Sequence, residues 1–353
     1  MPIYILVILF LSVFVVAYFL TPLTIKLAFK IGGTDEPDHR KVHVEVMPRL
    51  GGLAIFVAFM IPMLLIGKIS GPFIGVMIGA TIIFAVGIID DIYELSAWVK
   101  LIGQIIAASI AIYFGVMVHF VTNPFDGLLN LGFLSIPVTL IWIVGVTNAI
   151  NLIDGLDGLA GGVSVIAAAT MGVISLLQGQ PAVALAALIL VAAILGFLPY
   201  NFHPAKTFMG DSGSNLLGFI LGCLAVMSAA KSATLLSLFV PIVILGIPIF
   251  DTFFAIVRRI NNKAPIFQPD KDHLHHRLLA LGMNHTKCVL VIYGISGVFA
   301  AVAIALSLTN SPKAMLVLAL LLFLVVLGAD KIGLLTGETP TVKTLKRETQ
   351  KLK

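Results

Sequence analysis

The chain has 353 residues, of which 59% are hydrophobic and 11% are charged, and its mean hydropathy is +1.10. This composition excludes an ordinary soluble domain and indicates a multi-pass membrane protein. The net charge of +5 comes without a basic run interleaved with aromatic residues, so we expect no nucleic-acid partner and assign the basic residues to anionic membrane lipid. Cys223 and Cys288 lie in or beside apolar segments and provide neither a disulfide framework nor a CxxC metal site.

Apolar runs long enough to span a bilayer follow one another along the chain. The first, residues 3–27, has no basic residue ahead of it and Lys26 and Lys30 at its end, which predicts a retained helix with its N-terminus outside. Ten further runs lie near residues 51–67, 72–89, 98–118, 135–150, 160–178, 181–199, 213–230, 234–257, 287–308 and 313–328. The predicted fold is therefore an all-α integral membrane protein with about eleven transmembrane helices and a cytoplasmic C-terminus.

The distribution of charge supports this topology. Of the 22 Lys and Arg residues, it leaves outside only Lys68, Lys231 and Lys313, in agreement with the positive-inside rule. Of the 17 acidic residues, only Asp126 lies outside, and the rule does not explain this because acids contribute little to it. We therefore expect carboxylates to have a function at the cytoplasmic face.

The first inner loop, residues 32–52, mixes acidic and basic side chains, which are Asp35, Asp38, Arg40, Lys41, His43 and Arg49. Two interpretations stay open at this point. The loop is either a solvated connector that anchors helix ends to lipid phosphate or a clamp for a lipid-borne phosphate, with Lys41 as a candidate contact.

The second inner loop contains IIDDIYELSAWVK, in which Asp90 and Asp91 close a span and Lys100 follows ten residues after Asp90. A charged side chain costs about 2.5–3.5 kcal/mol at the bilayer centre and less near its edge. Two adjacent carboxylates at this boundary therefore predict a metal ion or another cation as partner. The sequence assigns no role to Glu94.

The segment NAINLIDGLDGLAGG, residues 148–162, interrupts an apolar region with Asn148, Asn151, Asp154 and Asp157. These residues follow one another at i, i+3 steps, so a helix end would present the two Asn on one face. The two Asp-Gly pairs then predict a turn before the next helix. A simple wet loop between membrane helices is the alternative.

The fourth inner loop, YNFHPAKTFMGDSGSN at residues 200–215, contains Asn201, Phe208 and Asp211. Asp211 and Ser212 could merely cap the following helix. An aromatic side chain beside a carboxylate flanked by glycines also suits a site where a planar base stacks while a metal ion holds phosphates.

The loop from residue 258 to 286 carries QPDKDHLHHRLLALGM. Its leucines predict a short interfacial helix with His273, His276 and Arg277 largely off the apolar side. Zinc binding has weak support from HxHH alone, and phosphate contact by His and Arg fits better. Before this loop, Asp251 is predicted to pair with Arg258 in a structural role.

Four motifs in this order, IIDDIYELSAWVK, NAINLIDGLDGLAGG, FMGDSGS and HLHHRL, resemble the polyprenyl-phosphate N-acetylhexosamine-1-phosphate transferase family over about residues 20–308. Within the family the chain resembles the WecA/TagO branch, which uses UDP-GlcNAc, and its TagO-type members most. The features are DEPDHRKVH, HLHHR and the eleventh span. The MraY branch, which uses UDP-MurNAc-pentapeptide, is the alternative.

The resemblance implies transfer of GlcNAc-1-phosphate from UDP-GlcNAc to undecaprenyl phosphate with release of UMP. This would be the first membrane step of teichoic acid or a related cell-envelope glycopolymer. It also implies Mg²⁺ as cofactor, with Mn²⁺ as a substitute, a homodimer, and a bacterial plasma membrane protein whose active site faces the cytoplasm. Residues 1–328 would form the transmembrane catalytic domain and residues 329–353 a basic cytoplasmic tail.

The family pattern also implies roles for individual residues. Asp211 and Asn151 would be the metal ligands. The donor's pyrophosphate and sugar would meet Lys100, His275, His276 and Arg277, its uracil would meet Phe208 and Asp157, and Asn201 and Asp154 would complete the donor pocket.

Asp90 and Asp91 remain open between two mechanisms. The lipid phosphate could attack directly while Asp90 removes a proton, or one carboxylate could attack first and form an aspartyl-phosphate. A function of a different class also stays open, because acids in a many-span protein also describe an ion-coupled transporter. Their position at span ends on one side favours the enzyme.

Overall fold

The computed structural model describes residues 2–36, 45–66, 71–123, 127–229, 239–263, 272–308 and 313–334. Several residues named above lie outside these ranges, namely Asp38, Arg40, Lys41, His43, Lys68, Asp126, Lys231 and the part of the predicted tail beyond residue 334.

Helices form almost the whole described structure, and eight of them are long and apolar enough to cross a membrane. These are α1 (Ile3–Ile31), α3 (Gly71–Tyr93), α5 (Ser135–Ile153), α6 (Leu159–Leu177), α7 (Pro181–Asn201), α8 (Gly210–Ala229), α12 (His285–Ser307) and α13 (Lys313–Lys331). Two shorter apolar helices are α2 (Gly51–Leu65) and α4 (Ala97–Tyr113). The protein is therefore a helical integral membrane protein, as predicted.

The run predicted as a single ninth span, residues 234–257, differs from the prediction. Its described part forms two helices, α9 (Phe239–Ile244) and α10 (Gly246–Asn261), which meet at Leu245. An apolar run shows that a segment can be buried, but it does not show where the helix axis changes direction.

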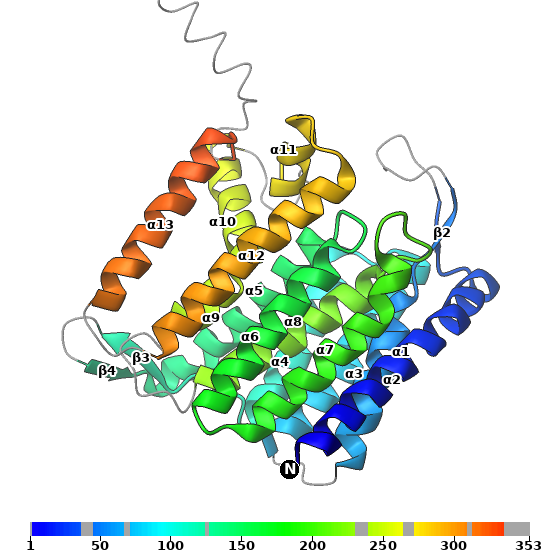
Figure 1. The fold of residues 1–353 in the computed structure, drawn as a ribbon, viewed down its shortest axis with the longest axis horizontal. Helices are drawn as coiled ribbons and strands as arrows, with labels where there is room; N and C mark the ends of the chain where they lie inside the picture. Colours follow the sequence, from blue (N-terminus) through cyan, green and yellow to red (C-terminus); the bar gives the residue numbers. More distant parts are fainter. Residues whose placement is uncertain are drawn as a thin grey trace, which may run out of the picture.

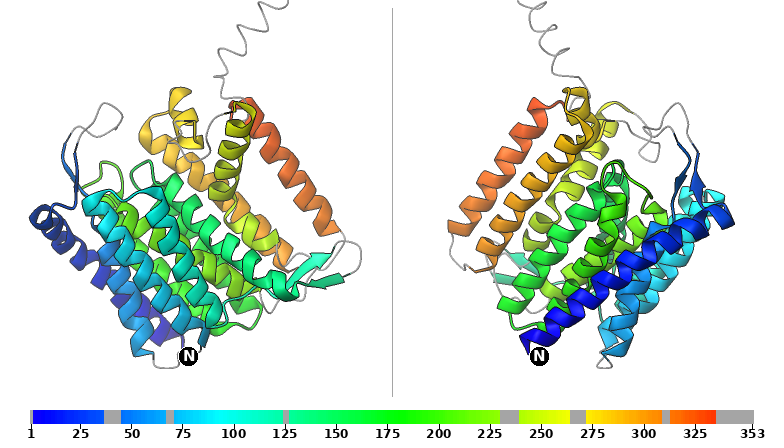
Figure 2. Two further views of the ribbon diagram at one scale, coloured as in Figure 1. Left: turned by 180° about the vertical axis from the view of Figure 1, so that it is seen from behind. Right: turned by 45° about the vertical axis from the view of Figure 1, so that its right-hand side comes forward.

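Two small antiparallel pairs of strands add to the helices, although the sequence predicted none. β1 (Thr34–Asp35) pairs with β2 (Met47–Pro48), with Thr34 opposite Pro48. β3 (Phe120–Asn123) pairs with β4 (Gly127–Asn130). A 3₁₀ turn, η1 (Gly132–Leu134), precedes α5, and α11 (Leu274–Ala280) is a short helix before α12. Figure 1 shows β2 and α11 at the end of the bundle opposite the N-terminus, and Figure 2 shows the same arrangement from two other sides.

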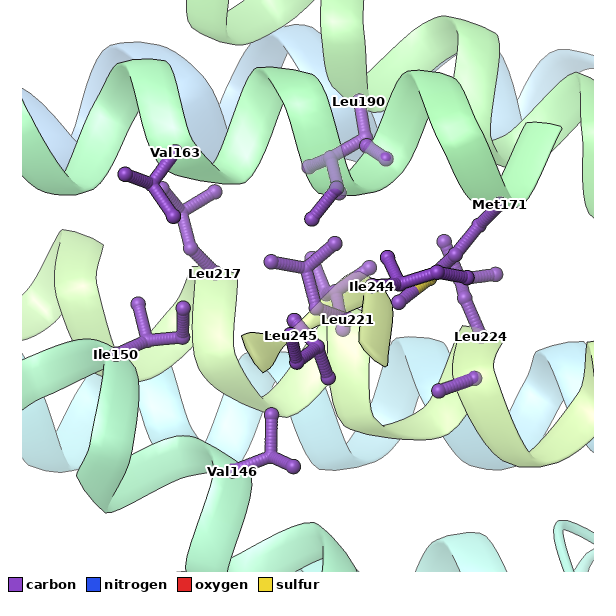
Figure 3. Close-up of a cluster of buried hydrophobic side chains, with 14 of the residues drawn as sticks. Val146, Ile150, Val163, Met171, Leu190, Leu217, Leu221, Leu224, Ile244 and Leu245 are labelled. Atoms are coloured by element: carbon purple, nitrogen blue, oxygen red, sulfur yellow. The ribbon is translucent and has the colours of Figure 1, made fainter. Parts of the chain in front are cut away.

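Helix α8 is the centre of the bundle, and almost all of its side chains are buried. Figure 3 shows Leu217, Leu221 and Leu224 of α8 among apolar side chains from neighbouring helices. The neighbours labelled there are Val146 and Ile150 of α5, Val163 and Met171 of α6, Leu190 of α7, and Ile244 and Leu245 at the end of α9. The start of α8 also touches α3 closely, since a Cβ atom at Gly87 would lie 2.4 Å from Cα of Ser212. This contact brings the ends of α3 and α8 together and positions the polar site described next.

Candidate active site

A pocket of about 580 Å³ opens at the end of the bundle that carries β2 and α11. Its size suits a small-molecule ligand. Seven of the residues predicted from the sequence line it, namely Asn151, Asp154, Asp157, Asn201, Phe208, Asp211 and His276. These residues come from three segments: the end of α5 with the turn that follows it, the stretch from the end of α7 to the start of α8, and α11. The structure therefore gathers residues that lie up to 125 positions apart in the sequence.

The start of α8 is capped by a carboxylate from another helix. Oδ1 of Asp91 accepts a hydrogen bond from the backbone N–H of Asp211 at 2.7 Å, and Oδ2 accepts one from the N–H of Ser212 at 3.0 Å. The first N–H groups of a helix have no partner within the helix, so a carboxylate placed here satisfies them and meets the positive end of the helix dipole. Asp91 thus does the capping that the sequence offered as an alternative role for Asp211 and Ser212.

Asp211, in the first turn of α8, is the centre of a polar cluster that opens to the pocket. Nζ of Lys100 lies 2.8 Å from its Oδ2 and 3.1 Å from Oδ2 of Asp90. Nδ2 of Asn151 donates to its Oδ1 at 3.1 Å. One lysine thus compensates two neighbouring carboxylates, of which only Asp90 belongs to the predicted acidic pair.

Both carboxylate oxygens of Asp90 are engaged by neighbouring groups. Its Oδ1 accepts a hydrogen bond from the N–H of Leu95 at 2.7 Å, and its Oδ2 pairs with Lys100. The side chain is nearly buried, and neither Asp90 nor Asp91 lines the pocket. The predicted pair therefore contributes to the position of Asp211 without lining the pocket: Asp91 caps its helix, and Asp90 shares Lys100 with it.

A second layer of amides fixes the helices that carry this cluster. Nδ2 of Asn215 donates to the backbone O of Asp211 at 2.8 Å, and Gln104 donates to Oδ1 of Asn215 at 3.0 Å. Gln104 also accepts a hydrogen bond from Asn148 at 2.7 Å. Asn148 and Asn151 lie on one side of α5, as their spacing predicted, and each contributes to the site from a rigid helix.

The turn after α5 begins at Asp154, which occupies the C-cap position of that helix. Burial, followed by the nearby carboxylates of Asp211 and Asp91, raises the pKa of the Asp154 carboxyl to about 7. The turn ends at Gly158, whose φ of 76° is readily available only to glycine. The predicted sequence of helix end, turn and next helix is confirmed.

Asn201 connects this turn to the loop before α8. Its Oδ1 accepts a hydrogen bond from the N–H of Gly158 at 3.1 Å, and its Nδ2 donates to the backbone O of Thr207 at 3.0 Å. Phe208 follows, and its N–H donates to the backbone O of Pro48 at 2.8 Å. These contacts fix the backbone on both sides of the pocket, so Phe208 and Asp157 are held at one wall of it.

The short helix α11 places its polar residues differently from the prediction. His276 lines the pocket, but His275 and Arg277 are buried and do not line it. His275 packs against Gly155, and burial lowers the pKa of its imidazole to about 3, so this ring is neutral at pH 7. Arg277 pairs with Asp272, with Nη2 and Oδ1 2.6 Å apart.

Asp251 corrects a second prediction. It does not pair with Arg258 on its own helix. Its Oδ2 lies 2.9 Å from Nδ1 of His273, and its Oδ1 accepts a hydrogen bond from the N–H of Leu274 at 2.7 Å. Arg258 donates instead to the backbone O of Leu334 at 2.7 Å. Spacing on one helix identified the wrong partner because the nearest donors belong to a segment more than twenty residues away.

Two residues of the first inner loop also line the pocket, namely Arg49 and Asp35, and Nη1 of Arg49 lies 3.3 Å from Oδ1 of Asp35. Two histidines of the site were not singled out from the sequence. His203 and His285 line the pocket from the loop after Asn201 and from the first position of α12. His203 stands two residues after Asn201 in an inner loop already marked as polar, and this position was the available signal.

Comparison with known proteins identifies the family of this chain. Residues 73–229 match the family model Glycosyl transferase family 4. The chain is 44% identical over 331 residues to a probable undecaprenyl-phosphate N-acetylglucosaminyl 1-phosphate transferase of Bacillus subtilis, covering 93% of this chain and 92% of the relative.

Two further relatives come from other bacteria. A decaprenyl-phosphate N-acetylglucosaminephosphotransferase of Mycolicibacterium smegmatis is 36% identical, over 81% of this chain and 78% of the relative. An undecaprenyl-phosphate alpha-N-acetylglucosaminyl 1-phosphate transferase of Thermotoga maritima is 32% identical, over 81% of this chain and 86% of the relative. The chain belongs to this family of polyprenyl-phosphate N-acetylglucosamine-1-phosphate transferases.

Proposed function

We propose that this protein transfers GlcNAc-1-phosphate from UDP-GlcNAc to undecaprenyl phosphate and releases UMP. The observation that carries the proposal is Asp211, which Lys100 and Asn151 hold at the edge of a pocket lined by Phe208 and Asp157. Such a pocket offers a cationic and metal-binding end for phosphates and an aromatic end for a base. The names of the relatives give the same donor sugar and lipid class.

The location of the site forms part of the proposal. The pocket lies at the end of the bundle to which the predicted topology assigns the basic residues, so we place it at the cytoplasmic face of the plasma membrane. The eight long helices, the two shorter apolar ones and the broken pair α9 and α10 support a proposed count of eleven crossings. The N-terminus lies at the end of the bundle opposite β2 and α11, which supports its proposed outside location.

The donors at Asp211 suit Mg²⁺, with Mn²⁺ as a substitute. Asp211 is a carboxylate at the pocket wall, and Asn151 donates through Nδ2, which leaves its Oδ1 as an oxygen ligand. Magnesium takes such hard oxygen ligands and completes its shell with substrate phosphates and water. When bound, the ion would neutralise charge on the pyrophosphate and on the leaving UMP. Lys100 adds a fixed positive charge at Oδ2 of Asp211, whereas Asn151 contacts Oδ1.

The other pocket residues orient the donor. Phe208 would stack on the uracil, and Asp157 would accept a hydrogen bond from it. Asn201 holds the two loops in register, and His276 reaches the pocket from α11. His275 and Arg277 act indirectly in this arrangement, since His275 packs against the turn at Gly155 and Arg277 pairs with Asp272.

The acceptor attacks directly in this proposal. Both oxygens of Asp91 accept hydrogen bonds from α8, and both oxygens of Asp90 are engaged by Leu95 and Lys100. A carboxylate in either position would have to break these contacts to reach a donor phosphorus. An oxygen of the lipid phosphate would therefore form the new bond to the sugar-bearing phosphorus while the bond to UMP breaks. The lipid phosphate is largely ionised near neutral pH, since its second pKa is about 6.

The test is formation of lipid-linked sugar by the purified full chain in nanodiscs with Mg²⁺ and undecaprenyl phosphate. Labelled UDP-GlcNAc should give product and UMP, and Asp211→Asn should abolish both. Product from UDP-MurNAc-pentapeptide alone would replace the donor in this proposal. No product from either donor, with protein that elutes as a single folded species, would contradict the transferase and favour an ion-coupled transporter, to be checked by solute uptake into vesicles. A role in teichoic acid synthesis stays a prediction.

A further inference from the structure

Three side chains that commonly bind metal ions meet at the rim of the pocket, apart from Asp211. Asp157 comes from the turn between α5 and α6, His203 from the loop between α7 and α8, and His285 from the first position of α12. Each offers one ligand atom, and the three atoms lie within 4.8 Å of one another. The fold thus brings together three segments that are far apart in the sequence.

The contacts within this rim cluster leave one polar atom unexplained. Nδ1 of His203 lies 2.8 Å from Oδ2 of Asp157, and the rings of His203 and His285 stack with centroids 4.2 Å apart. Nε2 of His285 is buried and has no hydrogen-bond partner within the described part of the chain. A buried polar atom without a partner costs free energy, and a bound ion is one arrangement that removes this cost.

The donor set is chemically different from the one at Asp211. Two imidazoles and a carboxylate are the protein ligands of Zn²⁺ in sites that keep a fourth position for water or substrate. Magnesium instead favours an all-oxygen set such as Asp211 and Asn151. We propose that Asp157, His203 and His285 form a second cation site, specific for Zn²⁺ or a similar transition-metal ion, that ties three segments of the pocket wall together.

Only a small adjustment would be needed to close this site around an ion. Ligand atoms about 2.0–2.1 Å from a tetrahedral ion lie about 3.3 Å from one another. The side chain of His203 is 41% exposed and can rotate toward the other two ligands. Asp157 is held by the N–H of Ala205 at 3.2 Å, so it would serve as the fixed ligand.

The experiment is thermal unfolding of the full chain in detergent, stripped of metal, with and without Zn²⁺ and with no Mg²⁺ or substrate. A ligand that binds only the folded state raises the unfolding temperature, so Zn²⁺ should stabilise the unaltered protein. His203→Gln and His285→Gln should each weaken Zn²⁺ binding at least about tenfold, by the loss of one ligand of three. His119→Gln is the matched control, because His119 is an exposed histidine beside β3, away from the rim cluster.

Unfolding in the absence of metal shows first that each variant is folded. An equal response to Zn²⁺ in the two rim variants and the unaltered protein would overturn the proposal, as would failure of the unaltered protein to retain Zn²⁺ in equilibrium dialysis. Asp211→Asn should keep the full response. A response lost in Asp211→Asn and kept in His203→Gln would place the ion at Asp211 and contradict the rim site. Because no substrate is present, failure of the proposed transferase would leave these results unchanged.

Discussion

The starts of α8 and α11 are built in the same way but do different work. In each, a buried aspartate from a long helix accepts hydrogen bonds from the beginning of another helix. Asp91 of α3 caps α8 through the N–H groups of Asp211 and Ser212. Asp251 of α10 caps α11 through the N–H of Leu274 and also binds the ring of His273.

The difference lies in what each helix presents after its cap. Helix α8 has 20 residues, lies at the centre of the bundle, and exposes Asp211 to the pocket from its first turn. Helix α11 has seven residues at the edge, and of its polar side chains His276 reaches the pocket while His275 and Arg277 are buried. A carboxylate cap therefore holds Asp211, the proposed metal ligand, in place at α8, whereas at α11 it mainly attaches a short helix to the bundle.

We expect the largest loss of activity from replacing Lys100, the cation at the start of α8, and a much smaller loss from replacing Arg277, the cation of α11. Lys100→Gln removes the charge that holds Asp211, and we expect kcat/KM to fall by about 10²–10³-fold, the range for losing one fixed electrostatic contact in an active site. Arg277→Gln should change kcat less than about tenfold, because Arg277 pairs with Asp272 outside the pocket. The measurement is UMP release at varied UDP-GlcNAc for both variants.

Equal losses of activity in the two variants would contradict this difference, since they would place Arg277 among the residues that contact substrate. Lys100→Arg adds a sharper control. It keeps the charge but changes the geometry of the contact to both carboxylates, so it should recover part of the activity. A variant as inactive as Lys100→Gln would mean that the lysine is needed for its shape as well as for its charge.

Loss of the Asp91 cap should lower the stability of the whole protein, whereas loss of the Asp251 cap should destabilise only α11. Asp91→Asn leaves one buried N–H of α8 without an acceptor, which costs about 1–3 kcal/mol. Because α8 is the core helix, the unfolding temperature of the whole protein should fall. Asp251→Asn should instead loosen α11 locally, seen as faster hydrogen exchange over residues 272–281 with a smaller change in the unfolding temperature.

Glu94→Gln is the matched control for these two variants, because Glu94 is an exposed carboxylate at the same end of the bundle. It should leave both stability and exchange unchanged. Faster exchange in α11 after Asp91→Asn, without any after Asp251→Asn, would reverse the assignment of the two caps.

Site residues at the ends of predicted membrane helices could be identified from the sequence. Asn151, Asp154 and Asp211 interrupt apolar runs, and the predicted topology puts these helix ends on the same side of the membrane, so their gathering at one pocket followed from topology. The capping role of Asp91 could not be read in this way, since its partners are backbone N–H groups 120 residues away. The burial of His275 and Arg277 depended on how α11 docks, which the leucine spacing leaves open. The break at Leu245 is likewise a tertiary feature within an apolar run.

The smallest change that we expect is in the pH dependence of the unfolding temperature, and it depends on the carboxylates near the start of α8. The pKa of Asp154 is raised to about 7 in the folded protein, by burial and by the carboxylates gathered at α8. In the unfolded chain an aspartate titrates near about 3.9, so the stability from the protonated form is complete below that pH and is lost as pH rises through about 7. Asp154→Asn cannot ionise and escapes this loss. In metal-free detergent solution, the unfolding temperature of Asp154→Asn minus that of the unaltered protein should therefore be about 2 °C larger at pH 8 than at pH 5.

Added Mg²⁺ provides the check on this interpretation. A cation bound near Asp211 would favour the ionised form of Asp154, so the gain of Asp154→Asn between pH 5 and pH 8 should shrink when Mg²⁺ is present. The same variant studied by hydrogen exchange should leave α11 unchanged at both pH values, because the carboxylates that act on Asp154 are at α8. A difference in unfolding temperature that stays constant across this pH range would show that Asp154 is already ionised at pH 5. The carboxylates at the start of α8 would then be compensated more fully than Lys100 alone provides.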